Sequence, residues 1–164
     1  MIIELAPALF SDQEVIENLW PLYVYDVSGY TGWGPSAEGR YDDGRPPLDD
    51  YWQRDDHEPY PIRCEGELAG FSMLRRYPGD AGLWDIGQFF VLRKFKRRRL
   101  GREAFRLSGS RKPGRWLTRV VLGNTGALKF WRNVIGEITN ETYSLAEDID
   151  IDAKMHFIRY GVEG

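Results

Sequence analysis

Apolar residues near the start of the chain fall into two blocks with different periods. Residues 1–5 are mostly apolar and predict a short strand. The next block has helical spacing: Val15, Ile16, Leu19, Leu22 and Tyr23. Ser11 or Asp12 stands where a helix cap is preferred. Because an interior proline costs about 3 kcal/mol, Pro21 predicts a kink or a division into two short helices.

The middle of the chain reads as a long loop followed by three strands. Residues 29–59 are rich in Gly, Pro, Asp and aromatic residues and show no steady period. Such a loop in a small domain is usually functional or disordered, and its rings argue against disorder. Strands are predicted at residues 60–64, 68–75 and 83–92, separated by turns at 65–67 and 77–80.

The last third alternates helices and strands. Apolar spacing predicts a helix at 100–107, ended by Gly109, and then a strand at 116–122. Asn124 is placed to cap a further helix, which Gly136 would close. Strands are expected near 137–143 and 153–160. This order predicts an α+β fold, a mixed α/β sandwich, formed as one domain by residues 1–164.

Charge is distributed unevenly, although the formal net charge is only -3. Between residues 26 and 56 there are eight acids and three bases, whereas residues 93–102 hold seven bases and no acid. The first region should attract cations and the second anions. A protein that holds an anionic cofactor beside a cationic substrate would have this pattern. The small net charge gives no bias toward nucleic acid or an anionic membrane.

Other features narrow the class of protein. Cys64 is the one cysteine, so no intramolecular disulfide or cysteine metal cluster is expected. His57 and His156 lie too far apart in sequence to suggest a metal site. No signal peptide is recognisable, and no apolar run approaches the ~20 residues that span a bilayer. We therefore expect a cytoplasmic protein with no metal and no membrane partner.

The basic segment has the form of an anion site. A strand ends near Leu92, a short turn with six bases follows, and a helix that carries the seventh begins near Leu100. The first backbone N–H groups of a helix have no partner within it, and they carry the positive end of its dipole. Such an end binds phosphate, and flanking Arg and Lys side chains add charge-assisted hydrogen bonds. Gly101 would let a ligand approach the backbone closely.

The segment from Phe89 to Arg102 resembles motif A of the GNAT acetyltransferase superfamily. In that motif a strand leads into an Arg/Gln-x-x-Gly-x-Gly/Ala loop over the pyrophosphate of coenzyme A. Lys96 stands at the first basic position, Arg99 at the first glycine and Gly101 at the second. The segment 124–131, Asn-x-x-Ala-x-x-Phe-Trp, is similar to the family's Asn-x-x-Ala-x-x-Phe-Tyr.

The resemblance is good over roughly residues 60–140, and residues 25–28 and 89–93 are similar to a bacterial subgroup of acetyltransferases. It implies a GNAT-like acyl-CoA N-acyltransferase fold, with a central, mostly antiparallel twisted sheet and flanking helices. It also implies acetyl-CoA as cofactor. The activity implied is transfer of an acetyl group to the amine of a small molecule, one that the acidic segment suggests is cationic.

The resemblance also implies site residues. Those expected to bind the cofactor are Phe89, Phe90, Val91, Lys96, Arg97, Arg98, Arg99, Leu100, Gly101, Arg102, Asn124, Phe130 and Trp131. A backbone N–H near Phe90 or Val91 would stabilise developing negative charge on oxygen. The acidic, aromatic segment is expected to hold the acceptor through Tyr25, Asp26, Tyr30 and Trp33.

The chain departs from the family at its catalytic positions. Gln88 stands near the family's general base and cannot accept a proton at neutral pH, and Asp85 is the nearest acid. Trp131 replaces the tyrosine that often acts as the acid, and its indole N–H is no substitute. Tyr143 is the remaining candidate for the acid.

Two other functions remain open from sequence. A non-catalytic acyl-CoA-binding module would explain Gln88 and Trp131. A nucleic-acid-binding domain could use the basic turn, although no nucleic acid is expected on balance. The sequence allows a monomer or a homodimer.

Overall fold

The structure is a computed structural model that describes residues 1–41, 48–150 and 153–164. Its strands are β1 (Ile3–Leu5), β2 (His57–Cys64), β3 (Glu67–Tyr77), β4 (Asp80–Val91), β5 (Gly114–Val121), β6 (Tyr143–Asp150) and β7 (Ala153–Val162). Its helices are α1 (Asp12–Thr31), α2 (Asp50–Gln53), a 3-10 turn η1 (Arg93–Phe95), α3 (Leu100–Gly109) and α4 (Thr125–Thr139). No helix in these described ranges is long and apolar enough to cross a membrane.

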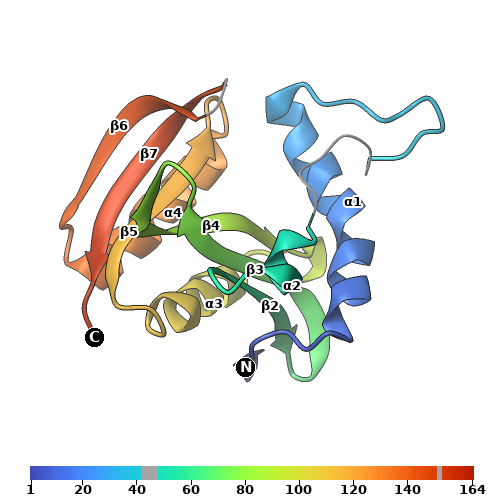
Figure 1. The fold of residues 1–164 in the computed structure, drawn as a ribbon, viewed down its shortest axis with the longest axis horizontal. Coiled ribbons are helices and arrows are strands. Elements are labelled where there is room, and N and C mark those ends of the chain that lie inside the picture. The colour runs from blue at the N-terminus through green and yellow to red at the C-terminus, as the bar shows by residue number, and fades with distance from the viewer. Residues whose placement is uncertain (42–47, 151–152) are drawn as a thin grey trace.

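The strands form one sheet in the order β1-β2-β3-β4-β5-β7-β6. Neighbouring strands are antiparallel except for β4 and β5, which run parallel (Figure 1). The chain crosses from β4 to β5 through α3, as a parallel connection requires. The expected mixed fold with a mostly antiparallel sheet is confirmed.

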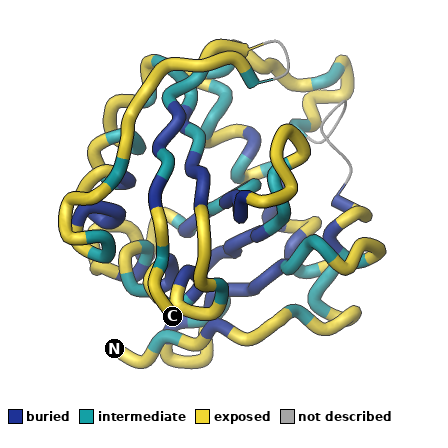
Figure 2. The backbone as a smooth tube through the Cα atoms, turned by 60° about the vertical axis from the view of Figure 1, so that its left-hand side comes forward, coloured by how far each residue is buried: buried dark blue, intermediate teal, exposed yellow. Residues whose placement is uncertain are grey.

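Helices cover both faces of the sheet, and each face has its own core. On one face, α1 and α2 bury Ile16, Trp20, Val24 and Tyr51 against Phe71 and other strand residues. On the other face, α3 and α4 bury side chains against Trp84, Ile86, Trp116 and other strand residues. Figure 2 shows the buried backbone concentrated in the central strands, while β6 is exposed along most of its length. We call these the α1/α2 face and the α3/α4 face.

Most predicted elements are present, and three differ. The division of the first helix is wrong, because α1 is continuous through Pro21. Burial of Trp20 and Val24 on either side of the proline stabilises the helix despite the missing N–H. The loop expected at residues 29–59 is shorter at both ends, because α1 runs to Thr31 and β2 begins at His57, and α2 interrupts it.

The end of α4 also differs from the sequence prediction. Gly136 does not close the helix, which continues to Thr139 and ends at Asn140 with a left-handed φ of 50°. The strand predicted at 137–143 is therefore wrong, and the strand starts only at Tyr143. Asparagine tolerates the left-handed region, so Asn140 supplies the stop signal that had been assigned to Gly136.

Candidate functional site

The two parallel strands at the centre of the sheet separate along their length. β4 and β5 pair at Trp84–Trp116 and Asp85–Leu117, near the start of their parallel course, and no further residue pair joins them. β4 then continues to Val91 with its other edge still paired to β3. The sheet is therefore open between the second half of β4 and the second half of β5.

The backbone of β4 presents a hydrogen-bond donor to this opening. The Leu92 N–H donates to the Ala69 carbonyl on β3 at 2.8 Å. Because N–H groups alternate in direction along an antiparallel strand, the N–H of Phe90 also faces β3, and that of Val91 faces the opening. Of the two positions expected to donate from β4, the geometry favours Val91.

A bulge in β4 sets which side chains face each side of the opening. Gln88 pairs with Met73 and Ile86 pairs with Leu74, so Gly87 is the extra residue. Beyond the bulge, Phe90 joins the core of the α1/α2 face, while Val91 packs into the core of the α3/α4 face.

The loop after β4 leaves backbone amides without partners where it enters α3. Phe95 is buried and anchors η1 to the α3/α4 core. Arg97 and Arg99 take left-handed φ angles of 67° and 61°, which turn the chain sharply into α3. The first hydrogen bond of the helix runs from the backbone N–H of Glu103 to the Arg99 carbonyl. The backbone N–H groups of residues 100–102 therefore have no partner within the helix. This geometry suits a bound anion.

The basic side chains of this loop divide into two groups. Lys94 pairs with Glu67, Lys96 with Asp26 at 3.0 Å, and Arg102 with Glu137 at 2.8 Å. Within the described part of the chain, four arginines of the loop make no side-chain hydrogen bond or ion pair: Arg93, Arg97, Arg98 and Arg99. The cations available to a phosphate ligand are therefore concentrated directly before α3.

Aromatic rings from α4 and β4 line the α3/α4 side of the opening. Asn124 caps α4 by accepting a hydrogen bond from the Ala127 N–H at 3.0 Å, as predicted. The Phe89 ring lies 5.1 Å from the Trp131 ring and 6.3 Å from the Phe130 ring, measured between centroids. Trp131 is buried in the core, so its position is that of a wall and not of an exposed acid.

Gly101 has a packing role that the sequence did not reveal. A Cβ at this position would lie 3.3 Å from the Phe130 ring and 3.6 Å from Val91 Cγ2. The glycine therefore lets α3 approach α4 and β4 closely. A side chain at this position would press against the Phe130 ring, so a bulky substitution should affect packing as well as access to the backbone.

On the α1/α2 side of the opening, a tyrosine contacts Gln88. The Tyr23 hydroxyl, from α1, donates a short hydrogen bond to Gln88 Oε1. Burial raises the pKa of Tyr23 to about 12, so it is neutral at physiological pH. Sequence reasoning missed Tyr23 as a site residue. Its helical spacing indicated a buried position, but nothing in the pattern indicated contact with a strand 65 residues away.

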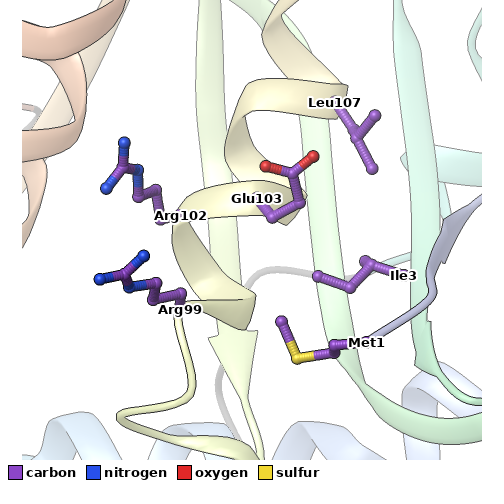
Figure 3. A pocket seen from close by; sticks show the side chains of 6 residues that line it. All are labelled: Met1, Ile3, Arg99, Arg102, Glu103 and Leu107. Atoms are coloured by element: carbon purple, nitrogen blue, oxygen red, sulfur yellow. The ribbon is translucent and has the colours of Figure 1, made fainter.

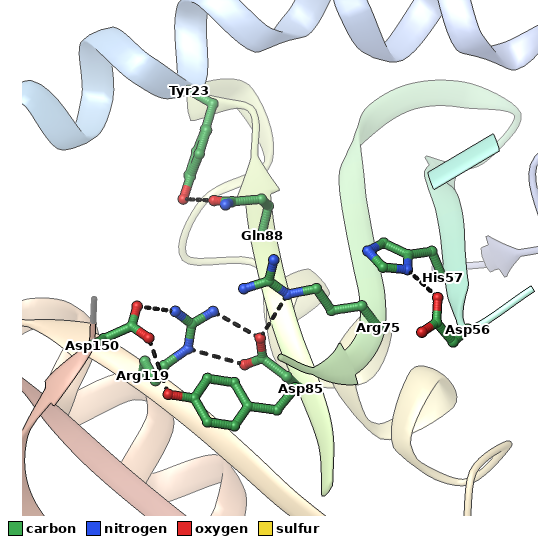
Figure 4. Close-up of polar contacts among 9 residues, drawn as sticks. Tyr23, Asp56, His57, Arg75, Asp85, Gln88, Arg119 and Asp150 are labelled. Atoms are coloured by element: carbon green, nitrogen blue, oxygen red, sulfur yellow. Dashed lines mark hydrogen bonds and ion pairs between the residues drawn. The ribbon is translucent and has the colours of Figure 1, made fainter. Parts of the chain in front are cut away.

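Asp85 lies in a chain of buried ion pairs on the same face (Figure 4). Its carboxylate accepts from Arg75 Nε at 3.0 Å and from Arg119 Nη2 at 2.7 Å. Arg119 continues the chain to Asp150, which also accepts from the Tyr77 hydroxyl. Asp85 is fully buried, and both carboxylate oxygens are engaged by guanidinium groups. These contacts give Asp85 a structural role and argue against a role as general base.

The expected acceptor residues lie around the C-terminal half of α1. Tyr25, Tyr30 and Trp33 are exposed. Asp26 pairs with Lys96, which joins the acidic and basic regions that the sequence had kept apart. Asp42 and Asp43, which contribute to the acidic segment, lie outside the described residues.

Tyr143 is not brought to the opening. It begins β6, pairs with Tyr160 on β7, and accepts a hydrogen bond from Arg132 Nε at 3.1 Å. Two strands, β7 and β5, separate β6 from β4. Tyr143 therefore lies away from the opening, because sequence proximity to α4 does not bring β6 beside β4.

A pocket of about 450 Å³ lies between β1 and α3 (Figure 3). It is lined by Met1, Ile3, Arg99, Arg102, Glu103 and Leu107. None of these residues belongs to β4 or β5, so this pocket is distinct from the opening between the two strands. We assign the chemistry to the opening, because a free backbone donor faces it and β4 leads directly from it into the basic loop.

The comparison with protein families decides the identity. The sequence model of the acetyltransferase (GNAT) family matches residues 17–136, which include the opening, the basic loop and α4 up to Gly136. The chain belongs to the acetyltransferase (GNAT) family. A GNAT member is an acetyltransferase enzyme that uses acetyl-CoA, as expected from the sequence. The assignment favours an enzyme over a non-catalytic module or a nucleic-acid-binding domain.

Solved structures support the GNAT fold at low sequence identity. An acetyltransferase from Thermus thermophilus is 16% identical, with a TM-score of 0.72 and coverage of 99% of this chain and 98% of that one. The Salmonella typhimurium protein yncA, solved with its cofactor acetyl-CoA, is 11% identical, with a TM-score of 0.64 and coverage of 98% and 94%. Arabidopsis thaliana NAA60, solved with a bisubstrate analogue, is 14% identical, with a TM-score of 0.60 and coverage of 99% of both chains. No curated protein matches the sequence.

Proposed function

We propose that this GNAT chain transfers the acetyl group of acetyl-CoA to the amine of a small cationic molecule. The observation that carries the proposal is the separation of β4 and β5 directly before the loop that holds the unpaired arginines. Acetyl-CoA supplies a thioester that is reactive toward amines and a diphosphate that needs an anion site. The opening and the loop provide a place for each.

The cofactor would be held on the α3/α4 side. The free amides at the start of α3 and the side chains of Arg97, Arg98 and Arg99 are available to phosphate oxygens. The rings of Phe89 and Phe130 offer an apolar wall to the arm of the cofactor. The Val91 N–H faces the opening and can donate to a carbonyl oxygen placed there.

The acceptor would approach from the α1/α2 side, where Tyr23 and Gln88 meet. Tyr23 stays protonated because its pKa is raised, so it acts as a hydrogen-bond donor and not as a base. Gln88 takes that hydrogen bond on Oε1 and keeps its amide nitrogen free to orient an amine or a water molecule. The ammonium proton would leave through water, since the oxygens of Asp85 are occupied. Catalysis would then rest largely on positioning.

Two measurements test this proposal. Acetyl-CoA at saturating concentration should raise the melting temperature, because a ligand that binds only the folded state stabilises it. A panel of amines, polyamines, amino acids and aminoglycosides should include at least one acceptor that releases free thiol from acetyl-CoA. The absence of any thermal shift would reject the cofactor site, and binding without thiol release across the panel would reject the transfer activity for these acceptors.

A further inference from the structure

Two polar side chains on the α1/α2 face have hydrogen-bonding capacity that the protein leaves unused. The Tyr51 hydroxyl, on α2, is buried and has no hydrogen-bond partner among the described residues. The Tyr51 side chain as a whole is only 7% exposed. Arg75, on β3, uses Nε to bind Asp85, and neither of its two terminal nitrogens makes a hydrogen bond or ion pair within residues 1–41, 48–150 and 153–164. A buried hydroxyl without a partner is costly, and such groups usually mark a missing ligand or water.

These two groups converge on one point of the sheet. A Cβ on Gly87 would lie 2.1 Å from the Tyr51 hydroxyl oxygen and 3.2 Å from Arg75 Nε. Gly87 is the bulge residue of β4 and directly precedes Gln88. The absence of a side chain at Gly87 therefore lets the Tyr51 hydroxyl and the Arg75 side chain pack against β4, next to the residue where we place the acceptor amine. Figure 4 shows Arg75 between Asp85 and Gln88.

The charges around this point are also unequal. The single carboxylate of Asp85 is shared by two guanidinium groups, those of Arg75 and Arg119, whereas Asp150 pairs with Arg119 alone among the residues described. The ion-pair chain is therefore positive at its Arg75 end and negative at its Asp150 end. Arg75 is 22% exposed at its side chain, so its positive end can be reached by a small molecule.

We propose that Arg75 and Tyr51 bind a carboxylate on the acceptor, so that the acceptor is an amine that also carries a carboxylate, as an amino acid does. The inference rests on the proposed acetyl transfer and narrows its acceptor to a zwitterion, in which an ammonium group supplies the positive charge and a carboxylate is held by Arg75 and Tyr51. Terminal guanidinium nitrogens match the two oxygens of a carboxylate, and the neutral Tyr51 hydroxyl adds a third donor. The carboxylate would sit beside Tyr51 and Arg75, and the amine beside Gln88.

The test uses matched acceptors that differ in this one group. The probes are the standard L-amino acids and their carboxamides, each measured by thiol release from acetyl-CoA with the full chain. At least one free acid should exceed its carboxamide in kcat/KM by tenfold or more, because only the acid presents a charged acceptor to the guanidinium and the hydroxyl. Equal or better rates with every carboxamide would overturn the proposal.

Two variants locate the preference. Tyr51→Phe removes a hydroxyl with no partner, so it should not weaken folding, and it should reduce the acid-over-amide ratio by roughly tenfold, mainly through KM. Arg75→Lys keeps a cation for Asp85 but loses the second pair of donors, and it should reduce the ratio as well. Tyr60→Phe is the matched control, because Tyr60 packs in the α3/α4 core and its hydroxyl bonds Glu58. An unchanged ratio in Tyr51→Phe would contradict the assignment.

Binding separates this inference from the proposed activity. The melting temperature of the coenzyme A-saturated protein is measured with each amino acid and each carboxamide at equal concentration. A rise with free acids that disappears in Tyr51→Phe, without thiol release, would keep the carboxylate site and reject the transfer. Thiol release with amines and no preference for a carboxylate would keep the transfer and reject the site. No rise and no release with any free acid would reject the carboxylate site.

Discussion

The two sides of the opening between β4 and β5 use charge in opposite ways. On the α3/α4 side, the loop leaves Arg97, Arg98 and Arg99 without partners among the described residues and sets them beside unpaired backbone amides. On the α1/α2 side, charges neutralise one another in the chain from Arg75 through Asp85 and Arg119. The α3/α4 side therefore has cations available to bind an external anion. On the α1/α2 side most charges are paired with one another, and few groups are left for a ligand.

The unpaired arginines on one side should matter for binding, and the buried ion pairs on the other side should matter for stability. Exposed, unpaired cations contribute little to folding, and their value lies in what they can bind. A fully buried carboxylate held by two guanidinium groups is costly to break, since the remaining charges would be buried without compensation. Substitutions on the two sides should therefore affect different measurements.

The largest effect is expected at Asp85. Asp85→Ala should lower the free energy of unfolding by about 3–5 kcal/mol, because Arg75 and Arg119 would lose their shared partner in the interior. Urea denaturation measures the change. Asp148→Ala, which breaks an exposed pair with Arg159, is the control and should have a much smaller effect. If Asp85→Ala folded as stably as the wild type but lost activity, Asp85 would be a base after all.

The next largest effect concerns the unpaired arginines. Replacing Arg97 and Arg98 together with alanine should weaken acetyl-CoA binding by more than tenfold, since charge-assisted hydrogen bonds are worth about 1.5–3 kcal/mol each. The loss should shrink as salt is added, because exposed charges are screened. Calorimetry at two ionic strengths measures both quantities. Lys94→Ala, whose ammonium is already paired with Glu67, should bind nearly as wild type. Equal losses of affinity in both variants would mean that the absence of an ion pair does not identify the side chains that bind phosphate.

A smaller effect is expected from the Tyr23 hydroxyl at high pH. Burial raises its pKa from 10.0 to about 12, so the folded state keeps a proton that the unfolded state loses. The stability linked to this proton is complete below pH 10 and is lost as the pH rises toward 12. Tyr23→Phe should therefore show a shallower decline in the free energy of unfolding over that interval. Parallel declines in the two proteins would show that the hydroxyl titrates normally.

The smallest effect is expected at the loop itself. Arg99 has a φ of 61°, a conformation that costs non-glycine residues about 1–2 kcal/mol. Glycine removes this cost from the folded state, but it also gives the unfolded chain more conformational freedom, which offsets part of the gain. Arg99→Gly should therefore raise the free energy of unfolding by less than about 1 kcal/mol. The same variant restores the family's glycine, and its affinity for acetyl-CoA measures what the guanidinium adds. A loss of stability would mean that the Arg99 side chain has a structural role.

The two sides also differed in how far the sequence could predict them. The cofactor side is made of two continuous segments, 89–102 and 124–131, so a local motif and a helix cap were enough to locate it. The acceptor side brings α1, α2, β3, β4, β5 and β6 together through contacts such as Tyr23 to Gln88 and Tyr77 to Asp150. No local pattern encodes such contacts, nor the distance in the sheet between Tyr143 on β6 and the opening beside β4.

Turns and element boundaries were also predictable where they depend on local sequence, and not where they depend on contacts between distant segments. The turn at Glu65–Gly66 was predicted from its local sequence, and both residues adopt the positive φ that such a tight turn requires, at 52° and 78°. The bulge at Gly87 was not predicted, since it depends on register against β3. The end of α4 was misjudged because a glycine in a helix and a glycine after a helix look alike in sequence.

The outer position of β6 has a consequence for solubility. This strand pairs with β7 on one side and, within the described part of the chain, leaves the backbone groups of its other side without a neighbouring strand. Such an edge is a template for association with another copy of the chain. The carboxylates of Glu147, Asp148 and Asp150 are paired with Lys154, Arg159 and Arg119, so charge repulsion does not guard this edge. The edge therefore remains available for pairing with a strand of another chain.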